Sequence, residues 1–152
     1  SSYNSKKSYI VENENLYNVL PQVTTTDASE TIVLVVDQDD DTRNAIEILS
    51  PNFGIDVVTG NSSKDIISKT SNLPSIPKII IVDGSDLIEE PLTTIDNIQE
   101  EFNKEIPVIF ITDDIENESL LIKSNQKVTL LQKPFSTSKL HQLIQLILSQ
   151  PI

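Results

Sequence analysis

The sequence predicts an α/β fold, a doubly wound parallel β-sheet of the (βα)₅ type with helices on both faces. Short apolar runs rich in valine and isoleucine, such as 33–36 and 79–82, are typical of parallel strands buried on both faces. Between these runs lie segments whose apolar residues have helical spacing. Strands that alternate with helices in this way indicate right-handed crossovers within one sheet.

The first half of the expected domain begins at Thr31 with strand 33–36. The helix that follows has apolar residues at helical spacing, namely Ala45, Ile46, Ile48 and Leu49. Pro51 is expected to end this helix, and the next strand is expected at 55–58. Ser62-x-x-Asp65 resembles a capping box, which predicts a helix containing Ile66, Ile67 and Leu73.

The second half continues the same alternation of strands and helices. Strand 79–82 precedes a helix whose apolar positions are Leu92, Ile95, Ile98 and Phe102. Strand 108–111 precedes a short helix around residues 120–122. Strand 128–131 precedes the clearest amphipathic helix, with apolar positions Leu140, Leu143, Ile144 and Ile147.

Residues 1–30 differ from the rest of the chain and are expected to be a linker or a docking extension, while 31–152 form the domain. They are rich in Ser, Asn and Thr and hold all three tyrosines of the chain. This composition favours a disordered linker. The alternative is that Leu16, Tyr17 and Leu20 form a short helix that docks its apolar face on the domain.

The composition excludes several classes of function. With 11 basic and 23 acidic residues the net charge is −12, which disfavours direct binding to nucleic acid or to an anionic membrane. The absence of cysteine excludes disulfides and thiolate metal sites, and it agrees with an intracellular, cytoplasmic protein. No apolar run approaches the roughly 18 residues that a membrane-spanning helix needs.

Polar residues follow four of the expected strands at the point where each strand ends. Asp37, Asp83 and Thr112 close three of the apolar runs, and Lys133 comes shortly after the last one. Ligands of open α/β sheets bind outside the carboxyl ends of the strands. We therefore expect two carboxylates, a hydroxyl and an ammonium group to meet in one site.

These residues and their order resemble the receiver domains of two-component signalling, over residues 31 to about 150. The spacing also fits, with 46 residues from Asp37 to Asp83, 29 from there to Thr112 and 21 more to Lys133. The resemblance implies a flavodoxin-like sheet of strand order 2-1-3-4-5. It also implies that the peptide bond between Lys133 and Pro134 is cis.

The resemblance further implies a role for each residue. Asp83 is then the phosphoacceptor, which takes a phosphoryl group from a phosphohistidine of a histidine kinase or a histidine phosphotransfer protein. Mg²⁺ is held by Asp37, Asp83 and the backbone carbonyl of Ser85. Lys133 pairs with Asp83 and then with a phosphoryl oxygen. Thr112 donates a hydrogen bond to the phosphoryl group and moves toward it.

Several positions depart from the family pattern, and residues 38 and 113 are the two that bear most directly on phosphoryl transfer. Gln38 stands where the family has a second acid that binds the metal directly, so Mg²⁺ is expected to bind weakly. Asp39 can replace that acid only if the turn shifts its register. Asp113, where the family prefers a small residue after Thr112, is expected to hinder an incoming phosphate by its size and its charge.

Two functions remain open at this point. The first is a receiver that is phosphorylated in a phosphorelay, and the second is a pseudo-receiver that binds partners without phosphoryl chemistry. The expected enzymatic activity is at most the self-phosphorylation and dephosphorylation typical of receivers. The chain is expected to be a fragment of a larger hybrid kinase or regulator, whose other domains are further expected partners. A dehalogenase-type phosphatase is disfavoured because it needs a second acid where Ser85 stands.

Simpler structural roles compete with the chemical ones. Asp37 and Asp83 can cap the helices that follow them, and Lys133 can be a structural ion pair. A partner is expected to dock near the same edge, on the first helix and the loop after the last strand. The apolar candidates there are Ala45, Ile48 or Ile46, Pro134 and Phe135, with Phe135 either the anchor of the interface or part of the core.

Overall fold

In the computed structural model, residues 31–85, 87–114 and 127–150 are described, and their strands form one parallel sheet. The strands are β2 (Thr31–Val36), β3 (Ile55–Gly60), β4 (Ile79–Asp83), β5 (Val108–Thr112) and β6 (Val128–Gln132). Their order in the sheet is β3-β2-β4-β5-β6, and every neighbouring pair is parallel. Counted along the chain this order is 2-1-3-4-5, so the expected topology is confirmed.

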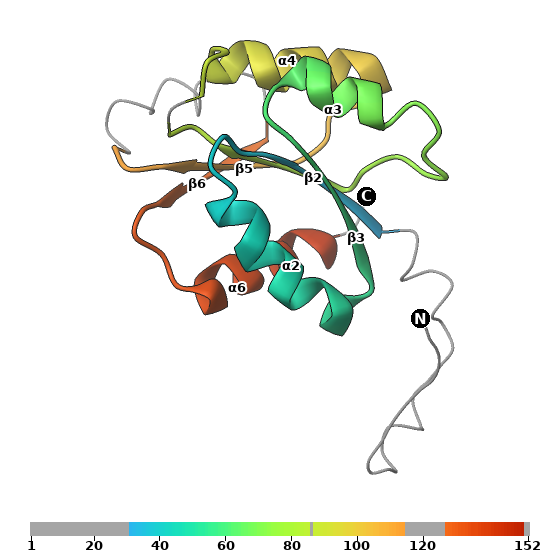
Figure 1. The fold of residues 1–152 in the computed structure, drawn as a ribbon. Coiled ribbons are helices and arrows are strands. Elements are labelled where there is room, and N and C mark those ends of the chain that lie inside the picture. The colour runs from blue at the N-terminus through green and yellow to red at the C-terminus, as the bar shows by residue number, and fades with distance from the viewer. Residues whose placement is uncertain (1–30, 86, 115–126, 151–152) are drawn as a thin grey trace, which may run out of the picture.

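Helices cover both faces of the sheet (Figure 1). α2 (Asp41–Phe53) and α6 (Thr137–Leu148) lie on one face, and α3 (Ser63–Lys69) and α4 (Pro91–Phe102) lie on the other. No helix in the described ranges is long and apolar enough to cross a membrane. The helix expected near residues 120–122 and the extension 1–30 lie outside the described residues.

The core is divided by the sheet into two apolar clusters. Successive side chains of a strand point to opposite faces, so β2 sends Leu34 and Val36 toward α3 and α4, and Val33 and Val35 toward α2 and α6. β4 and β5 are buried along their whole length. Burial on both faces explains why these strands consist of continuous apolar runs rather than of alternating polar and apolar residues.

Two helix ends differ from those expected. α2 continues past Pro51 and ends at Phe53, where Gly54 takes a left-handed φ of 63°. The fixed φ of proline is compatible with a helix, and a left-handed glycine is the stronger stop signal. α3 ends at Lys69, since the N–H of Thr70 turns back to the carbonyl of Ile67. Leu73 therefore lies beyond the helix, although it still packs against the core.

The expected cap of α3 is present in a modified form. The Ser62 hydroxyl accepts a hydrogen bond from the backbone N–H of Asp65 at 3.1 Å. The Asp65 carboxylate accepts from the N–H of Asn61 at 3.0 Å, one residue before the position that a capping box uses. Both bonds satisfy donors at the start of the helix, so α3 begins where the sequence predicted.

Glu89 joins the starts of α3 and α4 and holds the loop that follows β4. Its carboxylate accepts from the N–H and the hydroxyl of Ser63 at 2.9 and 2.8 Å, from the Thr94 hydroxyl at 2.8 Å and from the Asn97 amide at 3.3 Å. Burial alone would raise the pKa of Glu89, but these donors outweigh it and lower the pKa below its usual value. The charged Glu89 carboxylate thus links α3 to α4 through hydrogen bonds.

Replacing Glu89 with Gln should lower the free energy of unfolding by about 1–3 kcal/mol at neutral pH, because several hydrogen bonds lose their charged acceptor. Since the folded-state pKa is lowered, the contribution of Glu89 is present above the usual pKa of 4.5 and is lost as the pH falls through the folded-state value. Urea unfolding at neutral and acidic pH should show the difference shrink in acid. The exposed Glu101→Gln on α4 should change stability by less than about 0.5 kcal/mol.

Candidate functional site

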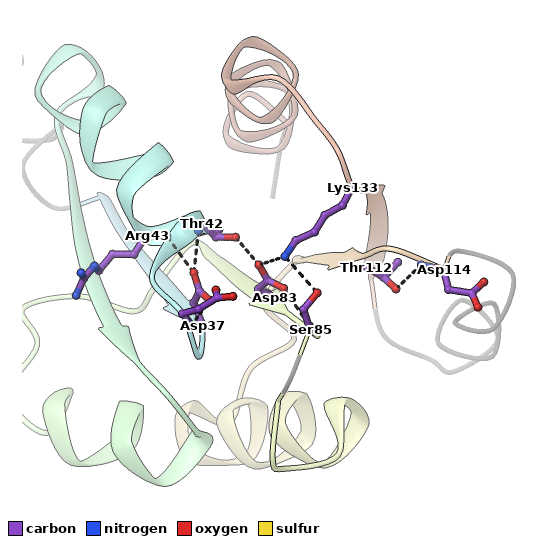
Figure 2. A network of polar contacts seen from close by, with 9 residues as sticks. Asp37, Thr42, Arg43, Asp83, Ser85, Thr112, Asp114 and Lys133 are labelled. Carbon is purple, nitrogen blue, oxygen red and sulfur yellow. Dashed lines mark hydrogen bonds and ion pairs between the residues drawn. The ribbon is translucent and has the colours of Figure 1, made fainter.

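The carboxyl ends of β2, β4 and β6 bring Asp37, Asp83 and Lys133 to one edge of the sheet (Figure 2). Backbone hydrogen bonds continue the strand pairing just past the strand ends and fix these positions. The N–H of Asp37 donates to the carbonyl of Gly60 at 3.0 Å, and the N–H of Lys133 donates to the carbonyl of Thr112 at 2.8 Å. The side chains therefore project from a rigid frame.

Asp83 and Lys133 form an ion pair at the centre of this edge. Lys133 Nζ lies 2.9 Å from Asp83 Oδ2, and the Asp83 side chain is fully buried while that of Lys133 is 23% exposed. Burial alone would lower the pKa of Lys133, but its hydrogen bond to Asp83 and the surrounding carboxylates raise it above its usual value. The peptide bond between Lys133 and Pro134 is cis, as expected.

The Asp83 carboxylate has two further donors. The Thr42 hydroxyl, from the first turn of α2, donates to Asp83 Oδ2 at 2.9 Å. The N–H of Ser85 donates to Asp83 Oδ1 at 3.0 Å. Ser85 also accepts a hydrogen bond from Lys133 Nζ on its hydroxyl at 3.1 Å. Both oxygens of the buried carboxylate are thus paired, which a buried charge requires.

Gly84 lets the chain turn tightly after Asp83. A Cβ at this position would lie 2.5 Å from Cζ of Phe110, whose ring is fully buried in the core. Real Cβ atoms do not approach other atoms so closely. The glycine therefore allows the backbone to lie on the Phe110 ring, with the Gly84 N–H donating to the carbonyl of Ile111 at 2.9 Å.

Asp37 caps the start of α2. Its carboxylate accepts from the N–H groups of Asp39, Thr42 and Arg43 at 3.0, 2.8 and 3.4 Å. Burial raises the pKa of Asp37, and the charge of Asp83 adds to this effect, while the bonds from the backbone N–H groups oppose it. The helix-capping role considered for Asp37 is therefore real, and it leaves the residue at the edge of the site.

A third carboxylate comes from Asp39 rather than from position 38. Asp37, Asp39 and Asp83 each offer a carboxylate oxygen, and these oxygens all lie within 4.8 Å of one another. Asp39 lies in the turn before α2, where its N–H donates to Asp37 Oδ1 at 3.0 Å. The next residue, Asp40, has a left-handed φ of 69°, and its carboxylate pairs with Arg43 at 3.1 Å. Clustered carboxylate oxygens are the ligands that a hard divalent cation such as Mg²⁺ prefers.

Thr112 lies at the same edge, but its hydroxyl is engaged in its own turn. It accepts a hydrogen bond from the N–H of Asp114 at 3.0 Å, and the residue itself is buried at the end of β5. Asp113 is exposed beside it. Of the four side chains expected to meet, Asp83 and Lys133 pair directly, and Asp37 is linked to Asp83 through Thr42. The Thr112 hydroxyl instead bonds within its own turn.

The structure has the architecture of solved receiver domains. The N-terminal receiver domain of a response regulator from Bacteroides fragilis has a TM-score of 0.65, with 22% identity over 80% of this chain and 98% of that chain. A response regulator from Clostridium difficile gives 0.64, with 20% identity over 79% and 97%. The receiver domain of the hybrid histidine kinase CckA gives 0.59, with 18% identity over 78% and 99%.

The chain has the receiver fold. No family model matches the sequence. No curated protein sequence matches it either. The similarity to receiver domains therefore lies in the three-dimensional structure, at sequence identities near 20%.

Sequence reasoning missed one residue of the site and left another undecided. Thr42 was overlooked because a hydroxyl residue in a first helical turn is common. Its position five residues after Asp37 was the available signal, since that places it above the strand end. Asp39 was expected only as a possible substitute for the acid missing at Gln38, and its carboxylate lies in the cluster with Asp37 and Asp83.

Proposed function

We infer that residues 31–152 are a phosphorelay receiver, which accepts a phosphoryl group on Asp83 from a phosphohistidine of a kinase or phosphotransfer protein. The observation that supports this most is the buried Asp83–Lys133 ion pair beside two further carboxylates. In the transfer the histidine N–P bond breaks and a bond from an Asp83 oxygen to phosphorus forms, while the histidine nitrogen keeps the electron pair. A signalling output follows if the modified edge changes its protein contacts.

The residues around Asp83 divide the work of this transfer. Lys133 neutralises the Asp83 carboxylate before transfer and is close enough to follow the charge onto a phosphoryl oxygen. Thr112 is the hydroxyl that turns toward the phosphoryl group, after leaving its bond to the N–H of Asp114. A phosphohistidine donor belongs to an intracellular compartment, so we place this domain in the cytoplasm.

Mg²⁺ fits the donor set of the site, and it would neutralise charge on the transferring group. Asp37, Asp83 and the backbone carbonyl of Ser85 are its proposed ligands, and Asp39 supplies the acid that Gln38 lacks. Burial is the main cause of the raised pKa of Asp37, and the charge of Asp83 adds to it, so a cation at this position would favour the charged form of both carboxylates. The Asp39 carboxylate would then offset the loss of Mg²⁺ affinity expected from Gln38.

Replacing Asp39 with Asn should weaken Mg²⁺ binding by about 1–3 kcal/mol, since one charged ligand is lost. Asp40→Asn is the matched control, because the Asp40 carboxylate faces Arg43 outside the cluster, and its affinity should stay near wild type. Mg²⁺ titration followed by amide NMR shifts measures all the variants. If Gln38→Asp tightens binding and Asp39→Asn has no effect, position 38 is the ligand position.

The pseudo-receiver is the second candidate, and specific features favour it. Gln38 removes an acid from the usual position, and the exposed Asp113 places a negative charge next to Thr112. Both hinder phosphoryl chemistry, yet the pairing of Asp83 with Lys133 supports it. Incubation with a radiolabelled phosphohistidine protein and Mg²⁺ tests the choice, and label on wild type but not on Asp83→Asn supports the phosphorelay receiver.

Other domains of the same chain are further proposed partners. In NtrX from Brucella abortus, the region similar to this chain is 26% of the solved chain. A receiver fold can thus occupy a small part of a larger protein, which agrees with a hybrid kinase or regulator as the source of this domain.

A further inference from the structure

Thr42 forms hydrogen bonds with two acids of the site, Asp37 and Asp83. Its backbone N–H donates to Asp37 Oδ2 at 2.8 Å, and its hydroxyl donates to Asp83 Oδ2 at 2.9 Å. The residue is fully buried, so water does not compete for these bonds. Figure 2 shows the hydroxyl reaching Asp83 from α2, on the side away from Ser85.

We propose that the Thr42 hydroxyl sets the lifetime of the phosphoryl group on Asp83 by favouring the free carboxylate. The proposal rests on the phosphorelay function inferred above. A hydrogen bond to a charged acceptor is stronger than one to a neutral acceptor. Phosphorylation removes the carboxylate charge, so the bond from Thr42 weakens whenever Asp83 is modified.

The bond from Thr42 weakens whichever oxygen of Asp83 is phosphorylated. If Oδ1 bonds to phosphorus, Oδ2 becomes a neutral carbonyl oxygen and Thr42 donates to a weaker acceptor. If Oδ2 bonds to phosphorus, Thr42 and Lys133 must share the less basic bridging oxygen of an acyl phosphate. In both cases the hydroxyl stabilises the product of hydrolysis more than the phosphorylated state.

The hydrolytic step shows where the hydroxyl acts. Water attacks phosphorus, the bond from phosphorus to the Asp83 oxygen breaks, and the carboxylate leaves with the electron pair, while both hydrogens of the water remain on the released phosphate. Charge grows on the carboxylate in the loose transition state of phosphoryl transfer. A donor already aimed at that carboxylate strengthens its bond there and speeds the step.

Removing the hydroxyl should therefore prolong phosphorylation. Thr42→Val keeps the shape of the side chain, and Thr42→Ala also lacks the hydroxyl in case the valine variant folds poorly. Each variant should raise the ratio of labelling rate to hydrolysis rate by roughly five- to tenfold. This factor corresponds to the difference in strength between a hydrogen bond to a charged acceptor and one to a neutral acceptor. Thr42→Ser keeps the hydroxyl and should restore the wild-type ratio.

The experiment uses acetyl phosphate with Mg²⁺ to label the protein, followed by removal of the donor and measurement of phosphoaspartate loss over time. Thr129→Val, in β6 and outside the site, is the matched control and should behave as wild type. Equal ratios in wild type and Thr42→Val, or a serine variant that resembles valine, would overturn the proposal while leaving the receiver function intact. Absence of label from every protein, wild type included, would overturn both.

Discussion

Replacing Lys133 with Met should lower the free energy of unfolding by about 3–5 kcal/mol at neutral pH, the usual cost of leaving a buried charge without its partner. Asp83 is fully buried, and Lys133 Nζ at 2.9 Å is its only cationic partner among the described residues. Thr42 and Ser85 would remain as neutral donors, which cannot offset the lost charge. Urea unfolding measures the loss.

Two further variants separate the ion pair from side-chain packing. Lys139→Met, at an exposed position of α6, should change stability by less than about 0.5 kcal/mol. Adding Asp83→Asn to Lys133→Met should recover much of the loss, because the uncompensated carboxylate is removed. If the double variant is no more stable than Lys133→Met alone, packing of the lysine stem rather than its charge explains the effect.

The same pair has a defined dependence on pH. The folded-state pKa of Lys133 is raised, so its contribution is fully present below the usual value of 10.5 and is lost as the pH rises through the folded-state value. Wild type and Lys133→Met should thus differ in stability at neutral pH and converge in strong alkali. Titration of Lys133 therefore does not change the stability of the fold near neutral pH.

The sheet could be predicted because its central strands are buried on both faces. Ile79–Val82 is a continuous apolar run, as expected for a strand buried on both faces. A short β-branched run of this kind between helical patterns indicates a parallel strand. The helix ends were harder to predict. Pro51 was a weaker stop than Gly54, since the left-handed φ of the glycine decides where α2 ends.

The chemical groups of the site and the Asp83–Lys133 pair could be predicted from the strand ends, but the contacts made by the turn before α2 could not. The chain order places Asp83 and Lys133 on one edge, and their pairing follows from opposite charge. The places of Asp39 and Thr42 depend on the turn before α2, where Asp40 is left-handed. A non-glycine residue with positive φ is uncommon, so that turn could not be expected from the residue types alone.

The apolar residues near the site differ in how available they are for docking. Ile46 is fully buried in the core, so this candidate was wrong as a surface residue. Ile48, on the same helix, is 70% exposed. Phe135 is half-buried and packs against the core cluster between the sheet, α2 and α6, as the alternative expectation held. Ile48 is therefore the cleaner probe of an interface on α2.

Substituting Asp83 with Asn should abolish both phosphoryl acceptance and any response of partner binding to beryllofluoride. The reason is chemical, since the amide lacks the anionic oxygen that must bond to phosphorus. Binding of a histidine phosphotransfer protein, measured by calorimetry with and without beryllofluoride and Mg²⁺, should change for wild type and stay constant for Asp83→Asn. Ile48→Ala should weaken binding in both states if the partner covers α2.

The pseudo-receiver predicts another pattern in the same measurements. Binding would then be identical in wild type and Asp83→Asn and insensitive to beryllofluoride, while Ile48→Ala or Phe135→Ala would weaken it. Because Phe135 also packs on the core, its variant needs a check of stability, which the exposed Ile48 does not. Stable label on Asp83 eliminates a purely structural scaffold. Failure of several phosphohistidine donors at ample Mg²⁺ would instead assign the buried Asp83–Lys133 pair to the stability of the fold alone.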